Sequence, residues 1–222
     1  MISVAIDGPA GAGKSTVARA AAQKLGYIYV DTGALYRAIG LKFKECGYDP
    51  DSDAEVDGIL ADTDIKIEFK DSVQHVLLDG RDVSELIRTP EASLMASAVS
   101  SKPEVRAFLL EMQRKLAREN NVIMDGRDIG TVVLPNAQVK IFLTASVSER
   151  AMRRYKELTL KGMDVKLSQI EEDIKIRDYN DSHREIAPLK PAPDSVTADT
   201  TGKKLEESAE MVVNIIKEKL GL

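Results

Sequence analysis

A glycine-rich segment near the N-terminus has the residue types and the spacing of a loop that binds phosphate. The residues GPAGAGKS at 8–15 fit the pattern G-x-x-x-x-G-K-[ST], in which glycines allow successive backbone N–H groups to converge on phosphate oxygens. In this pattern Lys14 is expected to reach the β- and γ-phosphates of ATP, and the Ser15 hydroxyl is expected to bind Mg²⁺. The predicted ATP-binding residues are Gly8, Pro9, Ala10, Gly11, Ala12, Gly13, Lys14, Ser15 and Thr16.

The sequence around this loop helps to choose among its interpretations. An apolar run precedes the loop and a helical pattern follows it, which favours a phosphate loop over a plain strand–turn–helix connection. A GTP-dependent switch should also carry an Asn-Lys-x-Asp motif, and this sequence has none. A loop of this kind is shared by enzymes and by ATP sensors, so the distinction between them depends on a second substrate site.

Two further motifs begin with an aspartate at the end of an apolar run. They are DTGALYR at 31–37 and DGRDIG at 125–130. Ligands of α/β proteins bind just beyond the carboxyl ends of the core strands, so Arg37 and Arg127 are predicted to grip an acceptor phosphate through paired hydrogen bonds. Either arginine alone would be interpreted as a surface charge. One of the two leading aspartates is expected to orient Mg²⁺; we favour Asp125, and a helix N-cap is the alternative role for the other.

The C-terminal third of the sequence carries a helix whose buried stripe changes from apolar to charged. The apolar stripe of the helix 167–181 continues into Arg177, Asp181 and Arg184. Burying unpaired charges is costly, so these side chains need partners. The alternatives are an internal ion pair between Arg177 and Asp181, or a polar ligand such as a phosphate or a ribose.

A cluster of three arginines precedes that helix. Arg150, Arg153 and Arg154 are spaced so that they share one helical face. The face is either a solvated surface or a flap that brings positive charge to the transferring phosphoryl group, whose transfer depends on positioning and charge neutralisation. A flap would also exclude water and prevent wasteful hydrolysis of ATP.

The arrangement of apolar residues predicts the sheet that would bring these motifs together. Short apolar runs alternate with amphipathic helices, which is typical of an α/β fold with a mainly parallel sheet. Within residues 60–88, Ile65, Ile67 and Phe69 alternate with polar residues, which predicts strands with one solvated face in a small antiparallel insert. The predicted strands are 2–6, 27–30, 122–124, 139–143 and 195–198, and the predicted helices are 14–25, 103–119, 167–181 and 203–220.

Composition and charge narrow the class of protein. The chain has 222 residues and a net charge of −5, and an acidic chain of this kind lacks the basic footprint that nucleic-acid binding needs. Cys46 is the single cysteine, so no internal disulfide can form, which fits a reducing compartment. No run approaches the ~18 apolar residues of a membrane span, and the N-terminus is interpreted as a first strand and not as a signal peptide. We therefore expect a cytoplasmic protein that binds neither membranes nor nucleic-acid polymers.

Five motifs in order give the chain a resemblance to the bacterial cytidylate kinase family. The resemblance covers nearly the whole chain and implies a nucleoside-monophosphate-kinase fold, with a five-stranded parallel core of the P-loop NTPase type, an acceptor-binding insert and a helical lid. The motifs are GPAGAGKST at 8–16, DTGALYR at 31–37, IRTPEASLMASAVS at 87–100, DGRDIGTVV at 125–133 and RDYNDSHREIAPL at 177–189. The implied domains are core segments at 1–38, 101–148 and 179–222, the insert at 39–100 and the lid at 149–178.

The resemblance also implies roles for individual residues. Ser97, Arg106 and Asp128 would read the cytosine ring, where a carboxylate can accept a hydrogen bond from the exocyclic amine that uracil lacks. Thr32 keeps the hydroxyl of a position that is commonly serine in the family. The implied CMP-binding residues are Thr32, Tyr36, Arg37, Ser97, Arg106, Arg127, Asp128, Arg177, Asp181 and Arg184, of which Arg37, Arg127 and Arg184 would hold the phosphate and Arg177 and Asp181 would contact the sugar. The implied catalytic residues are Lys14, Arg127, Arg150, Arg154 and Arg177.

The expected reaction is transfer of the γ-phosphoryl group of ATP to CMP or dCMP, with Mg²⁺ held near Ser15 and Asp125. No general base is needed, because an acceptor phosphate is already ionised near neutral pH. The alternatives are a related kinase that acts on UMP, AMP or another small acceptor, and a protein that senses ATP without catalysis. A sensor needs no second phosphate site, so the evidence against it is the set of arginines Arg37, Arg127, Arg177 and Arg184. We expect a monomer.

Overall fold

The computed structural model describes residues 1–49, 56–71 and 73–222, and the chain forms two compact units. The first unit joins Met1–Ile28 to Asn120–Leu222, and the second comprises Tyr29–Glu119. The predicted insert at 39–100 includes positions 50–55 and 72, which lie outside the described residues. Its boundaries and those of the lid stay predictions.

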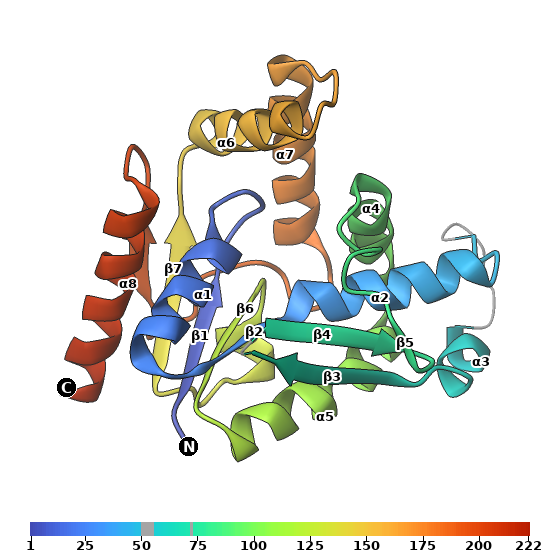
Figure 1. Ribbon diagram of the computed structural model, residues 1–222, viewed down its shortest axis with the longest axis horizontal. Coiled ribbons are helices and arrows are strands. Elements are labelled where there is room, and N and C mark those ends of the chain that lie inside the picture. Colours follow the sequence, from blue (N-terminus) through green and yellow to red (C-terminus); the bar gives the residue numbers. More distant parts are fainter. Residues whose placement is uncertain (50–55, 72) are drawn as a thin grey trace. The chain divides into compact units, whose positions relative to one another are not determined.

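Five parallel strands form one sheet, in the order β2-β6-β1-β7-β8 (Figure 1). Strands β1 and β6 are buried on both faces and are almost continuously apolar, whereas the residues of β7 alternate between buried and half-buried. Each strand lies within one or two residues of its predicted range. The strands are β1 (Ser3–Asp7), β2 (Ile28–Asp31), β6 (Val122–Gly126), β7 (Val139–Thr144) and β8 (Val196–Asp199).

Helices α1 (Lys14–Leu25) and α8 (Leu205–Leu220) pack against each other in the first unit. Their buried residues recur at helical spacing, and α1 ends at Gly26, whose left-handed backbone lets the chain leave the helix. A short π-helix at Ile129–Val133 follows β6. Among the described residues, no helix combines the length and the apolar character that crossing a membrane requires.

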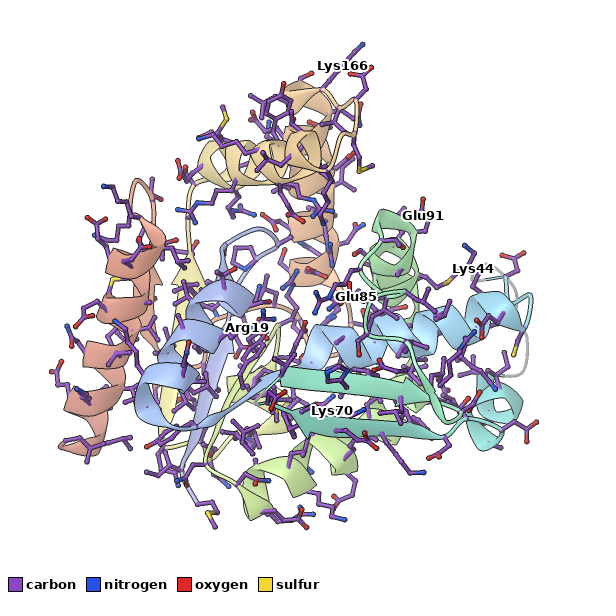
Figure 2. The ribbon with its side chains drawn as sticks, in the orientation of Figure 1. Arg19, Lys44, Lys70, Glu85, Glu91 and Lys166 are labelled. Carbon is purple, nitrogen blue, oxygen red and sulfur yellow. The ribbon has the colours of Figure 1, made fainter. Side chains whose placement is uncertain are left out.

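The predicted lid is a pair of packed helices, α6 (Val147–Leu160) and α7 (Leu167–His183). Ala151, Leu158, Ile170 and Ile174 form a small apolar cluster of their own between the two helices. This cluster gives the pair local packing apart from the sheet core. The tip of the pair is exposed, and the side chain of Lys166 extends from it just before α7 (Figure 2).

The second unit contains the antiparallel insert. Strands β3, β4 and β5 form a three-stranded sheet, with one face of β3 exposed and the other buried, which confirms the predicted small antiparallel sheet (Figure 1). The core of this unit includes Leu35, Ile39, Phe43, Val76 and Leu109. The elements are α2 (Thr32–Glu45), α3 (Val56–Ala61), β3 (Ile65–Lys70), β4 (Val73–Leu78), β5 (Arg81–Asp82), α4 (Pro90–Val99) and α5 (Pro103–Glu119).

Candidate active site

The glycine-rich loop connects β1 to α1, as the sequence motif requires. Gly8 has a φ of 153°, and a Cβ atom placed on it would lie 1.9 Å from the backbone oxygen of Leu143 in β7. No side chain fits there without moving backbone. The glycine therefore lets the loop leave β1 in direct contact with the neighbouring strand.

We predict that Gly8→Ala lowers the free energy of unfolding by about 3 kcal/mol, because the added methyl group must displace β7 or the loop. The matched control is Gly26→Ala. Gly26 has a left-handed backbone, and no atom lies within 4 Å of the place that an added methyl carbon would take, so this change costs only the backbone strain of about 1–2 kcal/mol. Urea unfolding of the two variants tests the difference. Equal losses of stability would contradict the close approach to β7.

Lys14 lies at the start of α1 with its ammonium group among cations. The side chain is 7% exposed, and its Nζ donates a hydrogen bond to the backbone oxygen of Pro9 at 2.9 Å. Burial, followed by the charge of the nearby Arg127, lowers the pKa of Lys14 to about 7, while Asp125 acts in the opposite direction. A site that crowds cations together in this way favours an anionic ligand, because phosphate oxygens would offset their mutual repulsion.

Ser15 and Asp125 form the pair that the sequence analysis assigned to the metal. The Ser15 hydroxyl donates a hydrogen bond to Oδ2 of Asp125 at 2.9 Å, and Asp125 is buried at the end of β6. A hydroxyl beside a carboxylate supplies the oxygen ligands that Mg²⁺ prefers, so these residues fit the ion. Asp31 is instead the N-cap of α2, where Oδ1 accepts a hydrogen bond from the Ala34 amide at 3.0 Å. Within the described part of the chain, no cluster of three or more acidic, histidine or cysteine side chains could hold a metal ion by itself.

Asp7, which the sequence analysis did not select, closes β1 and holds the turn after β6. Its two carboxylate oxygens accept hydrogen bonds from the amides of Ile129 and Gly130, both at 2.7 Å. Burial raises the pKa of Asp7 to about 6, and the two amide hydrogen bonds oppose that rise. The carboxylate therefore joins the phosphate loop to the DGRDIG motif. Asp7 could have been found from the sequence, because it follows an apolar run in the same way as Asp125.

Arg127 follows β6 and contacts both the phosphate loop and the end of α7. Its Nη1 donates to the backbone oxygen of Gly8 at 3.1 Å, and its Nε donates to Oδ2 of Asp181 at 2.7 Å. Asp181 is 6% exposed; burial raises its pKa, but Arg127, Arg177 and Arg184 together outweigh that effect and hold the pKa below the ordinary value. The charged stripe of α7 therefore has a partner on another element, in addition to Arg177 on the same helix.

A second charge pair lies beside the first. Arg184, immediately after α7, has Nη2 3.5 Å from Oδ1 of Asp128, and both side chains are largely buried. Arg177 lies one turn before Asp181 and helps to lower the pKa of that carboxyl group. The structure thus brings the predicted residues of β6 and α7 together in one unit. Basic and acidic side chains of the first unit therefore gather around the end of α7.

The three arginines that begin α6 differ in their surroundings. Arg150 is 4% exposed; it donates to the backbone oxygens of Ala145 and Ala10, both at 2.9 Å, and pairs with Asp178 of α7 at 2.7 Å. Arg150 therefore joins α6 and α7 to the phosphate loop. Arg154 pairs with Glu157 on its own helix and is partly exposed. Of the two alternatives for this helical face, a solvated surface does not describe the buried Arg150, and the contacts of these arginines with ATP stay predictions.

The remaining predicted residues lie in the second unit. Arg37 pairs with Asp31 at 2.9 Å, and its guanidinium lies over Gly33, where a Cβ atom would be only 3.0 Å from Nη1. Arg106 is 9% exposed and has its guanidinium carbon 5.8 Å from the centre of the Tyr36 ring, so it is not the surface residue that helix position alone suggests. Thr32 is buried at the start of α2, and Ser97 is half-buried on α4.

The parallel sheet, the phosphate loop with its lysine and the arginine-bearing helix pair define a P-loop phosphotransferase. The family model for cytidylate kinase matches residues 4–218. The chain belongs to the cytidylate kinase family.

Named relatives agree with this assignment. A cytidylate kinase from Caldicellulosiruptor bescii is 52% identical over 96% of this chain and 95% of its own length. One from Carboxydothermus hydrogenoformans is 51% identical over 97% of each chain. A crystal structure of an uncharacterized protein from Eubacterium ventriosum is similar with a TM-score of 0.54 and 11% identity, over 98% of this chain and 99% of that one, which shows the fold alone.

Proposed function

We propose that this protein transfers the γ-phosphoryl group of ATP to CMP and dCMP, giving ADP and CDP or dCDP. The observation that carries the proposal is the match to cytidylate kinases at about half identity over nearly the full length. The buried cationic group around Lys14, Arg127 and Arg184 supports it, because it suits two phosphate-bearing substrates.

The residues of the first unit suit direct in-line transfer. Lys14 would neutralise charge on the β- and γ-phosphates, and Mg²⁺ would take ligands from the phosphates and from Ser15, with Asp125 oriented toward it or its waters. Bound Mg²⁺ would supply neutralisation of the developing phosphate charge. Arg127 would hold the acceptor phosphate close to the loop, since it already donates to the Gly8 backbone. Helices α6 and α7 would act as a lid that keeps water from the transferring group.

The acceptor would be recognised by the residues that the family resemblance implies. Arg37, Arg127 and Arg184 would bind its phosphate, and Arg177 and Asp181 would contact its sugar. Ser97, Arg106 and Asp128 would read the base, with Thr32 and Tyr36 contributing from the start of α2. We further propose a monomer that acts in the cytoplasm, where ATP and nucleoside monophosphates are both present; light scattering during gel filtration tests the oligomeric state.

The test is ADP formation from Mg-ATP in the presence of CMP, dCMP, UMP, AMP or GMP. Turnover with CMP and dCMP, and little with the other three, supports the proposal. Preference for UMP or AMP would retain the phosphate chemistry and discard the cytosine-reading residues. No stimulation of ADP formation by any monophosphate would favour an ATP sensor.

We predict that Asp128→Asn weakens the discrimination between CMP and UMP by about tenfold. The carboxylate repels the uracil carbonyl that replaces the cytosine amine, whereas the amide can donate to that carbonyl. The measurement is the ratio of kcat/KM for CMP to that for UMP in the wild type and the variant. Asp199→Asn, which changes an exposed aspartate on β8, is the control. An unchanged ratio in Asp128→Asn would refute the base-reading role.

A further inference from the structure

The end of β2 is held by one side chain from the antiparallel sheet of the second unit. The Oε1 atom of Gln74 accepts a hydrogen bond from the Asp31 amide at 2.8 Å, and its Nε2 donates to the Asp31 backbone oxygen at 3.2 Å. Because β2 is an edge strand of the five-stranded sheet, its outer backbone groups have no neighbouring strand in that sheet. The amide of Gln74 takes the place of such a strand, satisfying a donor and an acceptor of the same residue.

Gln74 is itself fixed by the sheet that carries it. It lies in β4, paired in antiparallel register with Phe69 of β3, and is half-buried. The next residues along β4 include the buried Val76 and Leu78, which belong to the apolar core of the second unit. The position of the amide is therefore set by packed secondary structure and not by a loop.

The residue that Gln74 holds has both of its carboxylate oxygens engaged. Oδ1 of Asp31 caps α2 through the Ala34 amide, and Oδ2 accepts from Nη2 of Arg37 at 2.9 Å. The side chains of Asp31 and Arg37 are 22% and 23% exposed, so the ion pair is shielded from bulk water over most of its surface. The small Gly33 leaves room for this close packing.

We propose that Gln74 is a positioning residue for the acceptor phosphate: it fixes the backbone of Asp31, whose carboxylate in turn orients the Arg37 guanidinium. The inference rests on the proposed phosphate-binding role of Arg37. A guanidinium must present two N–H groups in a fixed direction to grip a phosphate, so small movements of its anchor weaken the grip. A purely structural attachment of the insert to β2 would instead affect stability without selecting one substrate.

The test combines Gln74→Leu with Arg37→Met in a double-mutant cycle. Leucine keeps the size of the side chain but makes neither hydrogen bond to Asp31. We expect Gln74→Leu to raise the KM for CMP about tenfold, while the KM for ATP changes less than twofold. When Gln74→Leu is added to Arg37→Met, kcat/KM for CMP should fall by less than twofold relative to Arg37→Met alone, because no guanidinium remains to be oriented. Val73→Ala, at an exposed neighbouring position of β4, is the control.

The outcomes separate this inference from the proposed function. The positioning role is overturned if Gln74→Leu lowers kcat/KM for CMP by the same factor in the wild type and in Arg37→Met. It is also overturned if Gln74→Leu changes the KM values for CMP and ATP equally. If the wild type turns over CMP, and kcat/KM for CMP falls strongly in Arg37→Met but not in Gln74→Leu, the positioning role is overturned and the proposed function stands. Absence of CMP turnover by the wild type overturns both. If Gln74→Leu does not fold, Gln74→Asn takes its place in the cycle, since its shorter amide cannot reach both Asp31 groups at once.

Discussion

Replacing Lys14 by methionine is expected to lower kcat/KM by about a hundred- to a thousandfold, the loss typical of removing one charge-stabilising donor at a transition state. The methionine fills the space of the lysine stem but brings no charge to the γ-phosphoryl group. Initial rates of ADP formation with CMP measure the loss. Lys44→Met, which changes an exposed lysine that extends from α2 (Figure 2), is the control and should keep wild-type rates. A Lys14→Met rate within tenfold of the wild type would contradict the role.

The same variant should change how stability depends on pH. Burial lowers the pKa of Lys14 from 10.5 to about 7, so between these values the unfolded chain holds a proton on this group that the folded protein lacks. The Lys14 contribution therefore makes the free energy of unfolding rise with pH from 7 to 10.5, and it is constant outside that window. Urea unfolding across this range should show a smaller rise in Lys14→Met than in Lys44→Met. Equal slopes would show that Lys14 titrates normally.

Arg127→Lys is expected to have the second large effect, a loss of about a hundredfold in kcat/KM for CMP. The guanidinium contacts Gly8 and Asp181 through separate nitrogens, and a lysine ammonium cannot span both while also binding a phosphate. Steady-state kinetics with each substrate varied in turn measures the loss. Arg118→Lys, on the exposed surface of α5, is the control for replacing an arginine by a lysine outside the site. Values within twofold of the wild type would remove Arg127 from the site.

The sheet could be predicted from the sequence because its strands are short apolar runs, of which β1 and β6 are buried on both faces. The phosphate loop was equally predictable, since its function depends on backbone geometry that glycines mark directly. The antiparallel sheet was recognisable because β3 alternates buried and exposed residues. In each case the signal lies within a few neighbouring positions.

The partners of the site residues could not be predicted in this way. Two aspartates at strand ends, Asp31 and Asp125, have the same local pattern, and only the fold separates the helix cap from the partner of Ser15. Asp7 has that pattern too, yet it holds the turn after β6. The bond between Gln74 and Asp31 spans 43 positions and depends on strand register, which no local signal gives. Arg150 lies on a charged helical face, and its burial against the loop backbone follows only from how α6 is packed.

The most direct test of the account follows the γ-phosphoryl group itself. The purified protein is incubated with Mg²⁺, CMP and ATP that carries a label in the γ-phosphate, and the products are separated. We predict that the label appears in the β-phosphate of CDP, in an amount equal to the ADP formed. Label released as inorganic phosphate, with CMP left unchanged, would contradict it.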